Sequence, residues 1–151
     1  MRVEDVLRSK NHRIVTVRTG ETVETAAKLM KAENIGALVV KDVCRTEGNT
    51  VVGMFSERDI VRAMLEHGGK VMQMKVSDLM SRNLITCAPT DGLHHVLKLM
   101  QDNHIRHVPV LDGFTLVGLV GVRDFIGIRL GELEREDKAP APELAPQELA
   151  H

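Results

Sequence analysis

The sequence predicts a mixed α/β fold of the α+β type, in which one β-α-β-β-α unit occurs twice. The first observation behind this prediction is that Gly-Met-Phe-Ser-Glu-Arg-Asp at 53–59 recurs as Gly-Leu-Val-Gly-Val-Arg-Asp at 118–124. The second is that Lys-Leu-Met occurs at 28–30 and again at 98–100. A unit of about 60 residues buries too little surface to be stable alone, so we expect the two copies to share one core.

The first copy is expected to contain, in order, a helical turn, a strand, a helix, two strands and a closing helix. The turn is expected at 3–7, the first strand at 14–17 and the second strand at 38–40. Between these strands, apolar residues recur at the spacing of one helix face, at Val23, Ala26, Ala27 and Met30. This spacing predicts a helix that begins near Val23.

The last strand of the first copy is expected to turn directly into a helix at Ser56. Ser56 is a suitable N-cap, because its hydroxyl can accept a hydrogen bond from a backbone N–H of the first turn. Asp59 follows three residues later, where a carboxylate favours the positive end of the helix dipole. In the second copy, Gly121 stands in place of the serine and Asp124 in place of the aspartate.

The second copy is expected to repeat these elements with a shorter loop. Its turn is expected at 76–80 and its first two strands at 84–87 and 108–110. Its helix is predicted by apolar residues at Leu93, Val96, Leu97 and Met100. The first copy carries a loop at 43–49 where the second has only Gly113, and loops tolerate such insertions at small cost.

These patterns divide the chain into a first repeat at 1–69, a second repeat at 70–131 and a tail at 132–151. The tail is acidic and rich in proline and alanine. We expect it to extend the last helix to about Arg135 and to be disordered beyond that point.

Composition excludes several classes of function. The chain of 151 residues has a formal net charge of −1, so no overall charge attracts nucleic acid or an anionic membrane. It contains no Trp or Tyr, which single-strand nucleic-acid binders need as stacking platforms. There is no signal-peptide core and no apolar stretch near the roughly 18 residues of a membrane span. The two cysteines have no metal or redox spacing, so a soluble cytoplasmic protein is expected.

Metal binding and catalysis are not expected either. Among the seven histidines, His94 and His95 are adjacent and cannot easily face one ion, and His104 and His107 have no acidic or cysteine ligand close in sequence. The sequence contains no motif of a glycine-rich phosphate loop and no motif that pairs a nucleophile with a base. The sequence therefore predicts no catalytic residue and no metal site.

The doubled unit resembles a tandem pair of cystathionine-β-synthase (CBS) domains, often called a Bateman module. The resemblance spans about residues 1 to 131, and its marks are the segment at 53–59, His-Ile-Arg-His-Val-Pro-Val at 104–110 and the paired strands at 14–17 and 84–87. It implies a stand-alone CBS protein of bacterial type, with two repeats related by a pseudo-twofold axis and two nucleotide clefts. It further implies frequent dimerisation and the regulation of another protein.

The resemblance implies that Asp59 and Asp124 bind the ribose of a nucleotide. An ionised carboxylate can accept hydrogen bonds from both hydroxyls of the sugar. The alternative is that each aspartate only stabilises the start of its helix.

Phosphate binding is expected from Ser56, Arg58, Arg106, His107 and Arg123. Ser56 supplies a hydroxyl at a helix start, and the resemblance implies that Arg106 and His107 reach phosphates bound by the opposite copy. The first copy has Gly36 and Ala37 in the places of Arg106 and His107, so we expect the Asp59 cleft to bind more strongly than the Asp124 cleft. The alternatives are exposed helix-start arginines at 58 and 123, a surface arginine at 106 and a structural strand residue at 107.

Adenine is expected to lie against aliphatic walls, whose backbone groups could read its edge. The residues assigned to this role are Val15, Thr16, Val17, Ile35, Gly36, Ala37, Thr86, Cys87 and Ala88. Most of them would belong to the core in any case.

The sequence therefore predicts a non-catalytic sensor of adenosine nucleotides (AMP, ADP or ATP, or else NAD(H)) that forms a homodimer and regulates a separate protein. One alternative is a ligand-free assembly module, and another is an S-adenosylmethionine sensor. A third is a small enzyme that uses His107, Arg106 and Asp59 as acid-base groups.

Overall fold

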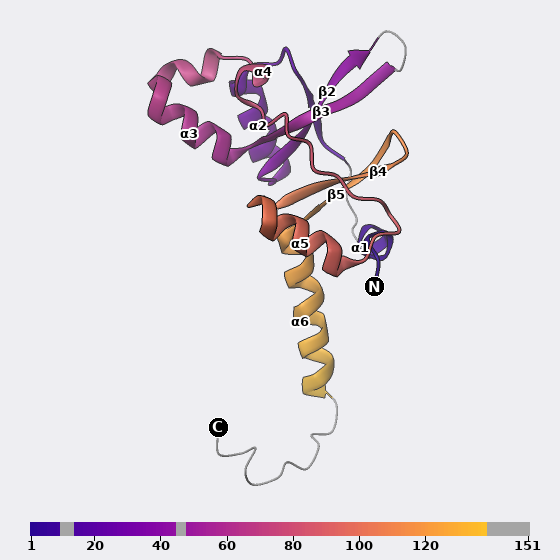
Figure 1. The fold of residues 1–151 in the computed structure, drawn as a ribbon. Coiled ribbons are helices and arrows are strands. Elements are labelled where there is room, and N and C mark those ends of the chain that lie inside the picture. Colours follow the sequence, from indigo (N-terminus) through magenta and orange to yellow (C-terminus); the bar gives the residue numbers. More distant parts are fainter. Residues whose placement is uncertain (10–13, 45–47, 139–151) are drawn as a thin grey trace. The chain divides into compact units, whose positions relative to one another are not determined.

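The computed structural model describes residues 1–9, 14–44 and 48–138 (Figure 1). The chain divides into two compact units, Met1–Val120 and the part from Gly121 onward. The first unit contains nearly all of both sequence repeats, and the second contains the last helix.

The first repeat follows the predicted order of elements. These are α1 (Val3–Ser9), β1 (Thr16–Arg18), α2 (Val23–Glu33), β2 (Ala37–Cys44), β3 (Gly48–Ser56) and α3 (Glu57–His67). A 3-10 helix, η1 (Gly68–Gln73), leads to the second repeat. The expected loop at 43–49 is shorter in the structure, because β2 and β3 extend into it, and its centre at 45–47 lies outside the described residues.

The second repeat contains the same series of elements, except that no strand corresponds to β1. It comprises α4 (Val76–Leu79), α5 (Leu93–Asn103), β4 (His107–Asp112), β5 (Thr115–Gly121) and α6 (Val122–Lys138). The mixed helix and strand composition confirms the predicted fold class. Helix α6 continues three residues past the expected end near Arg135, and the rest of the predicted tail lies outside the described residues.

The predicted strand at 84–87 is wrong. In the first repeat, β1 pairs in parallel with β2, with Val17 opposite Val40, and β2 pairs antiparallel with β3. In the second repeat, the corresponding pairing is reduced to one bridge between Cys87 and Val110 beside β4. The reason is Pro109, which has no N–H to donate to the preceding segment and so removes the next hydrogen bond of the parallel ladder.

The two repeats exchange their first helices. The N–H groups of Val76 and Ser77 at the start of α4 donate to the carbonyl groups of Glu21 (2.9 Å) and Thr19 (3.1 Å) in the first repeat. The buried side chains of Val76 and Met80 belong to the hydrophobic core of that repeat. Helix α4 is therefore part of the first repeat's packing, although it begins the second repeat in sequence.

The exchange is reciprocal. The N–H groups of Val3 and Glu4 at the start of α1 donate to the carbonyl groups of Asp91 (2.9 Å) and Pro89 (2.9 Å) in the second repeat. The first N–H groups of any helix have no partner within it, so these loop carbonyls satisfy donors that would otherwise be left unpaired. Four matched hydrogen bonds thus join the repeats into one unit with internal two-fold character.

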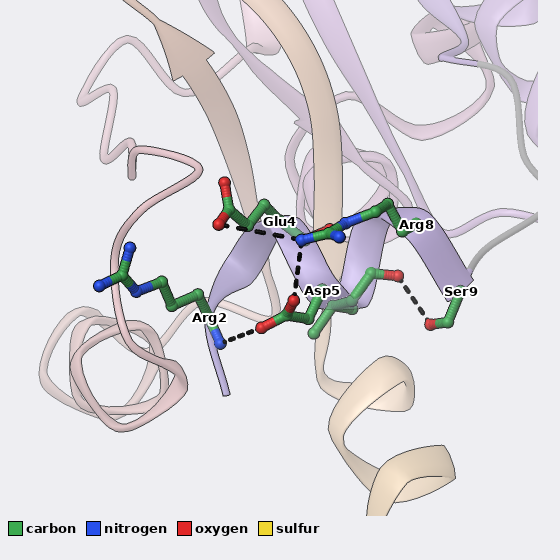
Figure 2. A network of polar contacts seen from close by, with 6 residues as sticks. Arg2, Glu4, Asp5, Arg8 and Ser9 are labelled. Carbon is green, nitrogen blue, oxygen red and sulfur yellow. Dashed lines mark hydrogen bonds and ion pairs between the residues drawn. The ribbon is translucent and has the colours of Figure 1, made fainter.

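Polar contacts hold α1 together, as Figure 2 shows. The backbone N–H of Arg2 donates to Oδ2 of Asp5 at 2.8 Å, and the Arg8 guanidinium contacts Oδ1 of Asp5 at 2.9 Å and Oε1 of Glu4 at 3.9 Å. Helices as short as α1 are unstable alone, so these contacts and the docking of buried Val3 hold it in place.

Gly53 and Gly118 stand at matching positions of the two repeats, and each lets a segment of the other repeat come close to its strand. A Cβ at Gly53 in β3 would overlap the backbone carbonyl oxygen of Ser81, which is paired with Met54. A Cβ at Gly118 in β5 would meet Cδ2 of Leu7 in α1 at 2.5 Å. The same position in each repeat is therefore covered by the other repeat, once by backbone and once by a flexible side chain.

Replacing Gly53 with alanine is expected to destabilise the protein by roughly 1–3 kcal/mol, because the Ser81 backbone cannot move without breaking its pairing. Gly118→Ala is expected to cost less, since the Leu7 side chain can change rotamer. Urea unfolding of both variants measures the difference. Gly20→Ala, whose Cβ would meet nothing within 4 Å, is the control, and equal losses at Gly53 and Gly118 would contradict this account.

Candidate functional site

The junction of β3 and α3 is a capping box. The N–H of Ser56 donates to Oδ2 of Asp59 at 2.9 Å, and the Asp59 N–H donates to the Ser56 hydroxyl oxygen at 3.4 Å. The Ser56 hydroxyl lies 3.1 Å from the same Oδ2 and donates to it. The half-buried Asp59 carboxylate is therefore held in one orientation, and within the described part of the chain its Oδ1 accepts no hydrogen bond.

The second junction lacks the hydroxyl, as the sequence predicts. In the second unit, the N–H of Gly121 donates to Oδ2 of Asp124 at 2.7 Å. The aspartate cap is thus common to both repeats, and the serine contact exists only in the first.

A pocket of about 360 Å³ lies where the two repeats meet. Arg58, from the first turn of α3, is its contribution from the first repeat, and the second repeat supplies the end of α5 and the residues that follow it. The lining residues are Arg58, Met100, Gln101, His104, Ile105 and Arg106. The pocket is a shallow hollow that is open to solvent.

The pocket is electrostatically one-sided. It contains two guanidinium groups and no carboxylate among its lining residues. Nη1 of Arg58 donates to the carbonyl oxygen of His104 at 3.5 Å, and neither Arg58 nor Arg106 forms an ion pair with a residue that the structure describes. Two arginines without carboxylate partners suit an anionic ligand such as a phosphate.

The pocket unites two of the five residues assigned to phosphate, Arg58 and Arg106. Ser56 is engaged with the Asp59 carboxylate. His107 is half-buried at the start of β4, where it interacts with another residue, and Arg123 lies in the second unit. None of these last three residues lines the pocket, and their phosphate role stays a prediction.

The residues assigned to adenine are mostly structural. Val17, Ala37 and Cys87 are buried, and Val15, Thr16, Ile35, Gly36, Thr86 and Ala88 are half-buried. Both backbone groups of Cys87 are already paired, its N–H with Pro109 at 3.1 Å and its carbonyl with the Leu111 N–H at 2.9 Å. Cys87 therefore has no free backbone donor to read an adenine edge, and the adenine site as a whole stays a prediction.

Sequence reasoning missed four of the lining residues, namely Met100, Gln101, His104 and Ile105. One local signal was available. His104 occupies the position of Asn34 in the first repeat, and both residues end a helix in the left-handed conformation, with φ of 54° and 52°. Asparagine and histidine are both enriched in this conformation, so the match between the repeats predicts the end of α5 at His104.

Neither a metal cluster nor a membrane-spanning helix occurs among the residues that the structure describes. No three His, Cys, Asp or Glu side chains among them are placed to hold a metal ion. Within the same ranges, no helix is long and apolar enough to cross a membrane.

Comparison with known proteins identifies the repeat. The family model of the CBS domain matches residues 3–66 and 76–131. The chain is 34% identical over 130 residues to the CBS domain-containing protein CBSX3, mitochondrial, of Arabidopsis thaliana. The match covers 82% of this chain and 62% of that protein, so the plant protein is longer than the shared region.

Solved structures agree with this match. A CBS-domain containing protein from Agrobacterium tumefaciens has a TM-score of 0.78 at 33% identity, over 85% of this chain and 92% of that one. The CBS domain pair of protein MJ0100, solved in complex with 5'-methylthioadenosine and S-adenosyl-L-methionine, has a TM-score of 0.74 at 26% identity. That match covers 87% of this chain and 98% of the other.

The buried Cys87 provides a test of the packing beside β4. Burial, and to a smaller extent the charge of Asp91, raises the pKa of the Cys87 thiol to about 12. Because the thiolate is the reactive form, Cys87 is expected to resist iodoacetamide at about pH 8 in the folded protein and to react after unfolding in urea. Peptide mass spectrometry reads each cysteine separately. Equal alkylation of Cys87 in the two states would show that it is not buried.

Proposed function

Because this chain belongs to the CBS domain family and carries the domain twice, we propose that it is a non-catalytic regulatory module that binds an adenosine nucleotide between its repeats. The candidate ligands are AMP, ADP, ATP and NAD(H). The observation that carries the proposal is the meeting of Arg58 from the first repeat and Arg106 from the second in one pocket. A phosphate bound by both would connect the two repeats.

The ribose is assigned to Asp59. Its carboxylate is fixed by the capping box through Oδ2, which leaves Oδ1 available to accept from a sugar hydroxyl. Arg58 directly precedes Asp59 in the first turn of α3, and apolar residues follow. A sugar at Asp59 and a phosphate at Arg58 would therefore bind to neighbouring residues of one helix turn. Arg123 precedes Asp124 in the same way, so the preference for the Asp59 cleft rests on Ser56 and on Arg106, which the second cleft lacks.

The charge of the pocket favours a nucleotide over S-adenosylmethionine. The MJ0100 pair is solved with S-adenosyl-L-methionine, which shares its adenosine group with the nucleotides. Its sulfonium carries a fixed positive charge, whereas a nucleotide carries negative phosphates. Two arginines with no carboxylate among the lining residues repel the former and attract the latter.

The module is proposed to regulate another domain or protein, and the cysteine pattern favours the reducing cytoplasm as the location of this chain. The enzyme alternative would use His107, Arg106 and Asp59 as acid-base groups. Conversion of bound nucleotide during incubation would support that alternative, and return of the nucleotide unchanged would support the regulatory role.

The ribose assignment predicts that Asp59→Asn weakens nucleotide binding more than Asp124→Asn. Asparagine can still accept the capping hydrogen bond, so the change removes mainly the charge that strengthens bonds to the sugar hydroxyls. The loss at Asp59 is expected to be roughly 10- to 100-fold in Kd, measured by titration calorimetry. Equal losses in the two variants would contradict the assigned asymmetry.

The phosphate assignment predicts that Arg106→Ala weakens binding of AMP or ATP much more than binding of adenosine. The nucleoside has no phosphate, so it loses no contact with the removed guanidinium. The salt dependence of nucleotide binding should also become flatter. Equal weakening of adenosine and ATP would make Arg106 a structural residue, and Arg82→Ala, an exposed arginine outside the pocket, is the control.

A homodimer is also proposed, because α3 presents an uncovered apolar face. Val61, Met64 and Leu65 lie within one turn of each other and are 59%, 56% and 87% exposed. Contiguous apolar surface of this kind marks interfaces. Light scattering at micromolar concentration is expected to give twice the monomer mass of 16.7 kDa.

The variant Leu65→Glu should shift the mass toward the monomer by placing charge in the interface. Phe114→Glu is the matched control, since Phe114 is 94% exposed but lies at the β4–β5 turn. A wild-type mass of 16.7 kDa, or equal effects of the two changes, would exclude α3 as the dimer interface.

A further inference from the structure

Helix α1 carries many of its polar contacts within itself, as Figure 2 shows. The N–H of Arg2 donates to Oδ2 of Asp5 at 2.8 Å, and the Arg8 guanidinium contacts Oδ1 of the same carboxylate at 2.9 Å. The Ser9 hydroxyl donates to the carbonyl oxygen of Val6 at 2.8 Å. The segment 1–9 therefore supplies its own cap and its own ion pairs, wherever it docks.

The contacts that dock α1 lead to the second repeat. The N–H groups of Val3 and Glu4 donate to loop carbonyl groups there, and the Leu93 N–H donates to the carbonyl oxygen of Met1 at 3.4 Å. Val3 and Val6 are buried, but they are not part of the hydrophobic core of the first repeat. Among the residues that the structure describes, no hydrogen bond joins α1 to the first repeat. Helix α1 thus packs on the repeat to which it does not belong in sequence.

The corresponding helix α4 is attached more firmly. Directly after it, Ser81 pairs with Met54 of β3 through two backbone hydrogen bonds of 2.8 and 3.0 Å. At the matching glycine of the second repeat, Gly118, the neighbour is the side chain of Leu7. Two backbone bonds must break before the α4 segment leaves its place, whereas a side-chain contact separates without such a loss. Of the two exchanged helices, α1 is therefore the one that can leave its place more easily.

We propose that the second repeat is also a docking site for α1 of a second copy of this chain, so that two copies can exchange their α1 helices. The α1 socket is formed by the carbonyl oxygens of Pro89 and Asp91 and by Gly118. An α1 from another copy makes the same contacts there as the chain's own α1, and exchange of an identical element is a low-cost route to dimers. The inference goes beyond the proposed function, because the exchange needs no nucleotide and does not use α3.

Disulfide trapping tests the exchange in the full chain. Leu7→Cys is mixed with Gly118→Cys, and oxidised glutathione is added, so the two introduced thiols join two copies only when α1 of one lies in the socket of the other. The Gly118→Cys chain keeps its own Leu7, which would meet the new Cβ at 2.5 Å, so its socket favours the α1 of the Leu7→Cys chain. Thr115→Cys, an exposed position of β5 outside the socket, replaces Gly118→Cys in the control mixture.

Peptide mass spectrometry is expected to find the bond between chains roughly tenfold or more above its yield in the control mixture. The double variant Leu7→Cys/Gly118→Cys reports docking within one chain. A bond that forms in the double variant and is absent from the mixture would overturn the proposal, and so would equal yields in the two mixtures. If no sample forms the bond, binding of a peptide decides.

A fluorescein-labelled peptide of residues 1–9 probes the socket without introduced thiols. Val3→Asp in the full chain disables its own α1 and leaves the socket unchanged. Because no attached α1 then competes, fluorescence anisotropy is expected to show the peptide binding this variant roughly tenfold more tightly than wild type. Asp5→Ala, which removes the cap at Arg2, serves in the same way if thermal unfolding shows that Val3→Asp is not folded. Absence of peptide binding to the folded variant, or equal binding of a scrambled peptide, overturns the proposal, whether or not the protein binds a nucleotide.

Discussion

The exchange of the first helices is the interaction on which the rest of the structure depends. Helix α4 places its N-terminal N–H groups on loop carbonyls of the first repeat, and α1 does the same on the second. Without the other repeat, each repeat would leave these loop carbonyls unpaired and would lose part of its core. The pocket also joins the two repeats, since Arg58 at the start of α3 donates to the carbonyl oxygen of His104 at the end of α5.

The symmetry of the backbone contrasts with the asymmetry of the side chains. Both repeats cap the strand–helix junction with an aspartate, and both end their second helix with a left-handed residue. The side chains differ at matching positions, with Ser56 against Gly121, Arg106 against Gly36 and His104 against Asn34. The duplicated backbone thus carries different side chains in its two copies, and Arg58, His104 and Arg106 line the pocket beside α3 and α5.

Local chemistry made much of this structure predictable. The repeat, the order of elements and the capping role of Ser56 and Asp59 follow from spacing and residue type, which act over a few residues. The strand predicted at 84–87 does not form, because Pro109 in β4 has no N–H to donate to this neighbouring segment. The proline leaves β4 itself intact. The exchange of α1 and α4 and the wall of the pocket formed by α5 join residues far apart in sequence. No periodicity reveals such contacts.

We propose that residues of both repeats bind one phosphate-bearing ligand. A crystal structure of the protein with ADP tests it most directly. We predict that phosphate oxygens lie within hydrogen-bond distance of the guanidinium groups of both Arg58 and Arg106, with the ribose at Asp59. A nucleotide that contacts neither arginine, or a crystal grown in saturating ADP that holds none between the repeats, would contradict the claim.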